Sequence, residues 1–213
     1  GSAARLALNC EAAGLLGDVR FLRGEASAGA SWRLPLGLRG HLAAACGLLL
    51  PTDGRPTCLQ DRFFLGGASG SCASVLKGFS HRGLGPAGLC QVRDPSKPAT
   101  RPADALGGDA MLNSYAALSA PVPIPLSGPG GGSLDGRAFA FAGLGSLAQG
   151  PCAGPGALLQ GLRGGARASV GLGLAVPLAG LGQLELTFAC PVWAQRHDVR
   201  QRWQLGMRMD FRE

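Results

Sequence analysis

The sequence has few charged residues and no long apolar run. Charged residues make up 15% of its 213 positions, against about 25% in ordinary soluble domains. Its longest apolar stretch lies near residues 42–51, far short of the ~20 residues that a transmembrane helix needs. The sequence therefore predicts no membrane-spanning helix, yet its surface is too apolar for a typical soluble protein. A transmembrane β-barrel fits both observations better than a soluble β-sandwich, because barrel strands alternate in polarity.

Catalytic motifs are also missing. No HExxH, P-loop or GxSxG is present, and the three His residues have no recognisable nucleophile and carboxylate partners. The stretch "GLGPAG" (83–88) matches G-x-G-x-x-G, but Pro86 lies inside it. Since no strand is expected before it and no helix after it, we interpret the match as coincidence. We predict no catalytic residue, no cofactor and no enzymatic activity.

The cysteines and aromatic residues exclude two further classes. Seven scattered Cys with no CxxC pair argue against a disulfide scaffold or a zinc site, so we expect reduced thiols and no metal. Aromatic residues make up only 6% and do not interleave with the basic ones, which disfavours nucleic-acid binding despite the net charge of +7. No signal peptide is recognisable. The sequence begins without Met, and we expect it to be a fragment.

What the sequence does have is alternation with period two. In "RWQLGMRMDF" (202–211) every second residue is apolar, beginning with Trp203 and Leu205, and the residues between them are polar or Gly. This pattern predicts a strand with one apolar and one polar face. Similar patterns over the rest of the chain predict about eight strands. The other seven candidate segments are 5–13, 18–34, 37–50, 107–123, 136–147, 167–177 and 183–190.

One segment is ambiguous, and two others have recognisable ends. The segment 37–50 is apolar enough for a helix on composition alone. The segment 107–123 is expected to end at its prolines. After the segment 183–190, Pro191 and the polar residues 195–201 are expected to form a turn.

Residues 51–106 show no strong periodicity, which makes this connection far longer than ordinary loops and predicts a functional role. Within it, the stretch "SVLKGFS" (74–80) places Lys77 beside Leu76 and Phe79. A loop folded back into a polar lumen would pack these apolar residues. Lys77 would then need a carboxylate, since an unpaired buried cation is costly. The alternative is a solvated Lys77 in an exposed loop.

Four stretches follow one another in a characteristic order: "DRFFLGG" (61–67), "SVLKGFS" (74–80), "GLGP" (83–86) and "LGGDA" (106–110). Together they resemble the C-terminal barrel of the BamA-type outer-membrane insertases. The resemblance is closest to the mitochondrial branch of the family, the core subunit of the sorting and assembly machinery. It implies an all-β fold, a transmembrane antiparallel β-barrel of sixteen strands, in which residues 1–213 supply the C-terminal half as one partial barrel domain.

The resemblance also implies site residues. The family holds a V-R-G-F motif in a loop that folds into the lumen, and this chain matches it with Leu76, Lys77, Gly78 and Phe79. Lys cannot form the bidentate carboxylate pair that Arg forms, so a looser clamp is expected. Acidic partners lie on strands after the loop, and the candidates for Lys77 are Asp109 and Glu185. Two departures from the family are that "FAFAG" (139–143) carries no carboxylate and that residues 88–105 look like a mobile insertion.

The last predicted strand matches a second family pattern. The β-signal of mitochondrial barrel proteins reads polar-x-Gly-x-x-hydrophobic-x-hydrophobic, and Gln204, Gly206, Met209 and Phe211 fit it. The resemblance implies that this strand forms one side of a lateral seam, where the unpaired edge templates an incoming strand.

The function implied by the resemblance is insertion of β-barrel proteins into the mitochondrial outer membrane. The implied partners are outer-membrane lipid, unfolded β-barrel clients and accessory subunits of an assembly complex, with no nucleic acid. Three alternatives remain open at this point. They are a plastid outer-envelope relative, a passive outer-membrane pore and a soluble β-sandwich or adhesive domain.

Overall fold

The computed structural model describes residues 2–14, 20–68, 74–88, 105–125, 133–150, 154–178 and 182–208. Its strands form one antiparallel sheet in which neighbours in the chain are neighbours in space. The predicted eight strands are confirmed. In chain order the elements are β1 (Ala3–Ala13), β2 (Phe21–Arg33), the short 3₁₀ helix η1 (Pro35–Gly37), β3 (Arg39–Pro51), β4 (Ala110–Pro125), β5 (Ser133–Ala148), α1 (Pro155–Gly164), β6 (Ala166–Leu178), β7 (Gly182–Trp193) and β8 (Trp203–Arg208).

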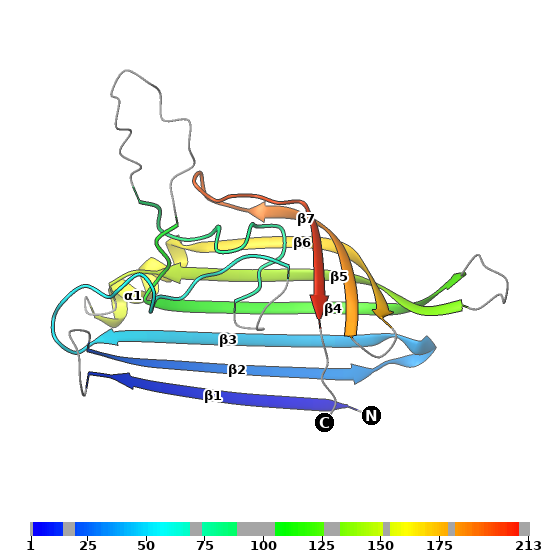
Figure 1. Cartoon of the computed structure of the whole chain (residues 1–213), viewed down its shortest axis with the longest axis horizontal. Coiled ribbons are helices and arrows are strands. Elements are labelled where there is room, and N and C mark those ends of the chain that lie inside the picture. Colours follow the sequence, from blue (N-terminus) through cyan, green and yellow to red (C-terminus); the bar gives the residue numbers. More distant parts are fainter. Residues whose placement is uncertain are drawn as a thin grey trace, which may run out of the picture.

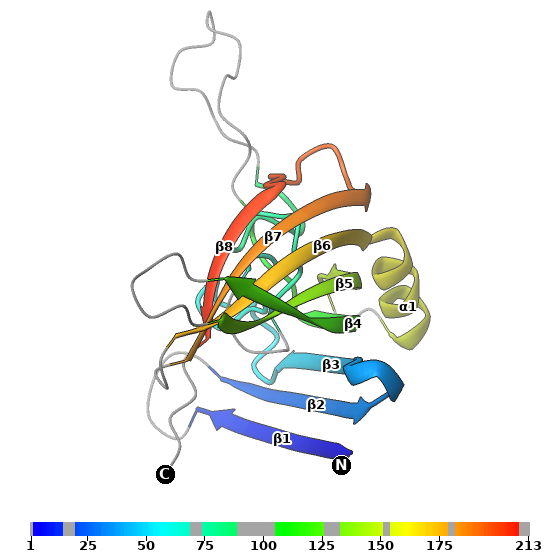
Figure 2. The same cartoon turned by 90° about the vertical axis from the view of Figure 1, so that its right-hand side faces the viewer.

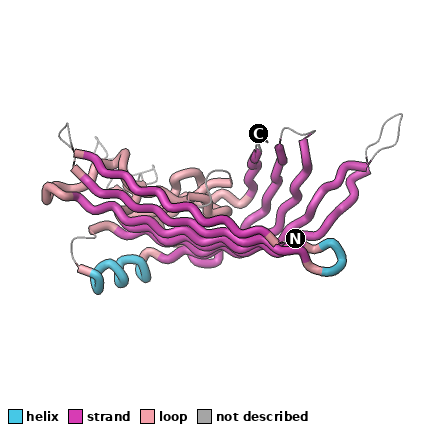
Figure 3. The backbone as a smooth tube through the Cα atoms, turned by 90° about the horizontal axis from the view of Figure 1, so that it is seen from below, coloured by secondary structure: helices cyan, strands magenta, loops and turns pink. Residues whose placement is uncertain are grey.

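The sheet curves like part of a barrel wall, and β1 and β8 are its two edges (Figure 1). The described parts of the loop between β3 and β4, which we call the β3–β4 loop, lie inside the curve (Figure 2). Helix α1 and η1 lie at opposite ends of the strands (Figure 3). We call the end with the β2–β3, β4–β5 and β6–β7 connections the turn end, and the other the loop end.

The two faces of the sheet differ as the alternation predicts. On β8, Trp203 and Leu205 are 63% and 67% exposed, while Gln204 is buried on the concave side. On β6, Leu172 is likewise exposed, while Ser169, three residues earlier and on the opposite face, is fully buried. A convex surface with so many exposed apolar side chains is suited to lipid. Since the described strands form a single sheet, they provide no second sheet for a sandwich.

Residues 39–50 of the ambiguous segment 37–50 belong to β3, so the structure decides for the strand over the helix that the composition left open. Its outward residues, such as Leu42, are exposed on the convex face, whereas Ala45 and Leu49 are buried on the concave face. The buried pair packs in one cluster with Phe63 and Leu65 of the β3–β4 loop. A strand covered by apolar groups on both faces reads as a continuous apolar run, which hides its period of two.

Prolines do not end the strands that contain them, contrary to expectation. Strand β4 continues through Pro121 and Pro123 to Pro125, paired with β5 throughout. Its pairing with β3 stops at Ser119, so the prolines lie where β4 has a neighbour on one side only, and a missing N–H is tolerated there. Strand β7 similarly runs past Pro191 to Trp193.

Helix α1 was not predicted from the sequence. Its signals are Pro155 in the first turn, Arg163 in the last and Gly165 after the end. Its three glycines weaken the helical pattern. The helix is fastened to β5 by a hydrogen bond from the Ser146 hydroxyl to the Leu162 carbonyl. Across the described ranges, no helix combines the length and apolarity needed to cross a membrane.

The β3–β4 loop forms no strand in its described parts and is held by isolated bridges. These pair Phe63 with Gly108, Leu65 with Leu84 and Phe79 with Arg200. Its side chains Leu65, Leu76, Phe79 and Leu84 belong to the main buried cluster. Most of the proposed mobile insertion at 88–105 lies outside the described residues.

Candidate functional site

The loop motif, residues 76–79, is buried against the concave face. Leu76 and Phe79 are both almost fully buried. Two glycines of β5 make room for Leu76, since a Cβ on Gly143 or Gly145 would come within 2.9 or 3.0 Å of its methyl groups. The loop is also fastened to β4, where the Asn113 side-chain amide donates a hydrogen bond to the Val75 carbonyl. The absence of a side chain at these two positions of β5 thus creates the space that Leu76 occupies.

Lys77 makes a buried ion pair with Glu185 of β7. The Lys77 Nζ lies 2.7 Å from Glu185 Oε2, and the two side chains are 6% and 18% exposed. Of the two candidate carboxylates, Glu185 therefore meets Lys77. The contact joins Nζ to one carboxylate oxygen, as expected for a point charge rather than an Arg fork.

Aromatic rings complete the surroundings of the Lys77 ammonium. Its Nζ is 4.8 Å from the ring centroid of Phe139, 5.6 Å from that of Phe141 and 6.0 Å from that of Tyr115. The negative ring faces attract a cation at this range. The segment 139–143, which lacks the carboxylate expected from the resemblance, thus supplies two rings to the same cation.

The rings fit because β6 has no side chains beneath them. A Cβ on Gly173 would come within 2.2 Å of the Phe139 ring, and one on Gly171 within 2.6 Å of the Phe141 ring. The glycines of "SVGLGL" therefore allow aromatic side chains of the neighbouring strand to lie flat across them. The sequence contains this signal as an alternation of Phe on one strand and Gly on the next.

Gly78 is required by both conformation and space. Its φ is +94°, a region that L side chains rarely adopt. A Cβ there would lie 3.2 Å from the Ala189 Cβ and 3.4 Å from the Ser169 Cβ. The motif backbone therefore touches β6 and β7 directly, which only Gly permits.

Gln204 of β8 clamps the backbone of the motif. Its Oε1 accepts a hydrogen bond from the Gly78 N–H at 2.9 Å, and its Nε2 donates one to the Phe79 carbonyl at 2.7 Å. The β7–β8 connection adds a second set of contacts, in which Gln201 N–H donates to the Gly78 carbonyl and Ser80 N–H to the Val199 carbonyl. The polar residue of the proposed β-signal is thus bonded to the loop.

Replacing Gln204 by Leu should weaken this clamp. The Gly78 N–H would lose its acceptor in a buried site, which costs about 2 kcal/mol. The Phe79 carbonyl suffers less, because it also accepts from the Gly67 N–H. We expect a lower midpoint of thermal unfolding in detergent and faster proteolysis within the loop. Gln183→Leu, at the open cavity, is the matched control, and equal shifts in both variants would contradict the clamp.

Of the three remaining residues of the proposed β-signal, the structure describes Gly206. Gly206 is buried on the concave side of β8, next to Glu185 in the β7–β8 register. Met209 and Phe211 lie outside the described residues.

Asp109 does not reach Lys77, which corrects its place among the candidate partners. It lies at the loop end just before β4, where its Oδ1 is 3.5 Å from Arg62 Nε and accepts a hydrogen bond from the Thr57 hydroxyl. Its Oδ2 accepts one from the Gly150 N–H. Asp109 therefore fastens the beginning of the β3–β4 loop, while Lys77 extends toward the middle of the sheet.

A second buried ion pair, not predicted from the sequence, joins β6 to the β7–β8 connection. The Arg167 guanidinium lies 3.1 Å from Asp198 Oδ1, and the side chains are 2% and 1% exposed. Arg167 also donates to the Gly165 carbonyl and to Gln195 Oε1. This pair fixes the connection that carries the backbone contacts of Gly78 and Ser80.

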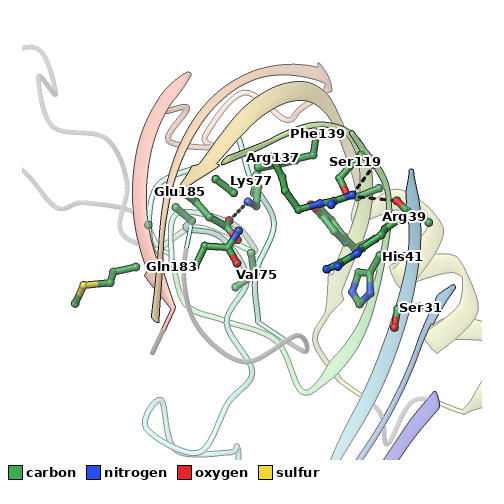
Figure 4. A pocket seen from close by; sticks show the side chains of 17 residues that line it. Ser31, Arg39, His41, Val75, Lys77, Ser119, Arg137, Phe139, Gln183 and Glu185 are labelled. Atoms are coloured by element: carbon green, nitrogen blue, oxygen red, sulfur yellow. Dashed lines mark hydrogen bonds and ion pairs between the residues drawn. The ribbon is translucent and has the colours of Figure 1, made fainter. Parts of the chain in front are cut away.

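A cavity of 540 Å³ opens beside Lys77 toward the turn end. Figure 4 shows Lys77 and Glu185 on one side of it and Arg39 and Arg137 on the other. Among the described residues that line it, Glu185 is the only carboxylate. In the part of the chain that the structure describes, no group of His, Cys, Asp and Glu residues could hold a metal ion.

Three comparisons relate the chain to known proteins. A model of the Omp85 superfamily domain matches residues 1–211. The chain is 31% identical over 199 residues to the sorting and assembly machinery component 50 homolog A of Xenopus laevis, and 28% identical over 197 residues to the Homo sapiens homolog. Each alignment covers 92% of the chain, which spans 38% of the relative's length.

A solved structure shares the fold. BamA from Haemophilus ducreyi lacking POTRA domains 1–3 superimposes with a TM-score of 0.69 at 19% identity. The match covers 96% of this chain and 37% of that one. The curved sheet is therefore built like part of an outer-membrane β-barrel.

Proposed function

The chain belongs to the Omp85 superfamily, and from this premise we propose that it forms part of a barrel that inserts other β-barrel proteins into the mitochondrial outer membrane. The likeness to sorting and assembly machinery components supports this function and favours the mitochondrial branch over the plastid one. The proposed partners are membrane lipid, unfolded β-barrel clients and accessory subunits. The mechanism requires no bond chemistry.

The observation that carries the proposal is the link between the loop motif and the edge strand β8. Among the described strands, β8 pairs with β7 alone, so its other edge offers unpaired N–H and C=O groups to an added strand. Gln204 on this same strand holds Gly78 and Phe79. A client that pairs with β8 therefore acts on a strand whose position the loop stabilises.

Besides the contacts of Gly78 and Phe79 with β8, the motif is held through the charge of Lys77, which binds Glu185 and the surrounding rings. Glu185 belongs to β7, the neighbour of β8, and the rings belong to β4 and β5. The motif thus connects the middle of the sheet with its edge. Such a brace keeps the edge strand in register while its outer side remains open for pairing.

Lys77→Ala should slow client assembly several-fold while leaving membrane targeting intact. The loop loses its ion pair, but Glu185 lies at an open cavity where water can solvate it, so the fold survives. The measurement is the assembly rate of a radiolabelled β-barrel precursor in mitochondria that carry the variant. Lys77→Arg, which keeps the charge, is the control, and assembly at the normal rate in Lys77→Ala would refute the role of the loop.

A further inference from the structure

Arginines gather on the concave face at the turn end, and none of them makes an ion pair with a described carboxylate. Arg33 of β2 and Arg39 of β3 are directly opposite each other in the sheet register, which places like charges on one face at an energetic cost. Arg137 of β5 lies two strands from Arg39, with Ser119 of β4 between them. The cluster thus spans four neighbouring strands.

Arg137 is held in a fixed position. Its Nε and Nη2 donate to the Ser119 hydroxyl, both at 3.2 Å, and Nη2 also donates to the Ser119 and Gly37 carbonyls, both at 3.1 Å. These acceptors are neutral, so the hydrogen bonds orient the guanidinium without neutralising it. A cation positioned in this way is ready to bind an anion without further loss of side-chain entropy.

The surrounding cavity is positive. Arg39, Arg137 and Lys77 all line it, and the one carboxylate among its described lining residues, Glu185, is already paired with Lys77. Among the described residues, neither Arg39 nor Arg137 makes an ion pair, and this includes Asp135 on the same strand as Arg137. The volume of 540 Å³ lies within the range of small-ligand pockets.

We propose that Arg39 and Arg137 form an anion-binding site for a carboxylate or phosphate group at the turn-end mouth of this cavity. Guanidinium groups bind both anions through paired, charge-assisted hydrogen bonds. The carboxylates of an acidic peptide and a free phosphate present the same chemistry to the site. A bound anion offsets the repulsion between the arginines. The site is distinct from strand pairing at β8 and does not depend on it.

The experiment measures binding to the whole protein in detergent micelles at low salt. The probes are a fluorescein-labelled hexaglutamate peptide, followed by anisotropy, and unlabelled inorganic pyrophosphate as competitor. The Arg39→Gln/Arg137→Gln double variant should bind the peptide about tenfold more weakly, since charge-assisted hydrogen bonds are lost. Arg196→Gln, an exposed change in the β7–β8 connection at the loop end, should bind like the unaltered protein.

The outcomes separate the two sources of the anion. Displacement of the peptide by pyrophosphate supports a site that also accepts phosphate, whereas peptide binding without displacement supports an acidic polypeptide. Unchanged binding in the double variant, equal weakening in Arg196→Gln, or binding of neither probe overturns the proposal. If the double variant fails to fold, Arg39→Gln alone replaces it, because no described hydrogen bond uses the Arg39 side chain.

Discussion

Asp198→Ala should lower the free energy of unfolding by about 3–5 kcal/mol, the cost of leaving one partner of a buried ion pair uncompensated. Arg167 and Asp198 are almost completely buried, so water cannot replace the carboxylate. Asp198 also accepts a hydrogen bond from the Gln195 N–H at 2.5 Å, and the turn loses this bond as well. We expect the β7–β8 connection to open, so that Gly78 loses its contact with Gln201 and Ser80 its contact with Val199.

The measurement is thermal unfolding in detergent, followed by heat-dependent mobility on gels, together with limited proteolysis of the connection. Asp53→Ala is the matched control, since Asp53 is exposed and its described hydrogen bond goes to the nearby Arg55 N–H. An Asp198→Ala midpoint equal to that of Asp53→Ala would show that the buried pair does not support the connection.

Glu185→Ala should cost about 3 kcal/mol, the lower end of the range for a broken buried pair. The Lys77 ammonium stays buried without its carboxylate, but the rings of Phe139 and Phe141 continue to attract it. The stability loss is therefore larger than for Lys77→Ala, which leaves the carboxylate at the open cavity. The readouts are the unfolding midpoint and the rate of cleavage in the loop.

A double variant tests whether the buried, unpaired charge of Lys77 causes the stability loss expected in Glu185→Ala. Lys77→Met combined with Glu185→Ala removes the stranded cation and keeps an unbranched apolar stem against the rings. We expect it to recover most of the stability lost in Glu185→Ala. Glu11→Ala, which removes an exposed partner 4.0 Å from Arg23, should cost less than about 1 kcal/mol. A double variant less stable than Glu185→Ala would contradict the ion-pair explanation.

Much of the sheet was predictable because alternation is a local property of extended backbone. The alternation around Trp203 and Leu205 gives both the strand and its two faces. Segment 37–50 was ambiguous between strand and helix because the loop covers its concave face with Phe63 and Leu65, which the local pattern does not record. The prolines of β4 were misread since their effect depends on whether β3 still runs beside them.

The site was predictable only as far as the motif itself. Burial of Lys77 beside Leu76 and Phe79 implied a carboxylate, and the resemblance narrowed the choice to Asp109 and Glu185. The choice between these two depends on where the loop turns within the curve. The contact between Gln204 and Gly78 joins residues 126 positions apart, and no sequence pattern signals it.

Which side chains face each way follows from the sequence alone, because successive residues of a strand alternate whatever surrounds them. It also placed a Gly at position 78, and the structure shows that this Gly turns against β6 and β7 with a φ of +94°. Which groups meet across the curve is known only from the folded chain: Lys77 meets Glu185 and the rings, Arg167 meets Asp198, and Arg39 and Arg137 line one cavity. These encounters depend on register and curvature, which many distant contacts set together.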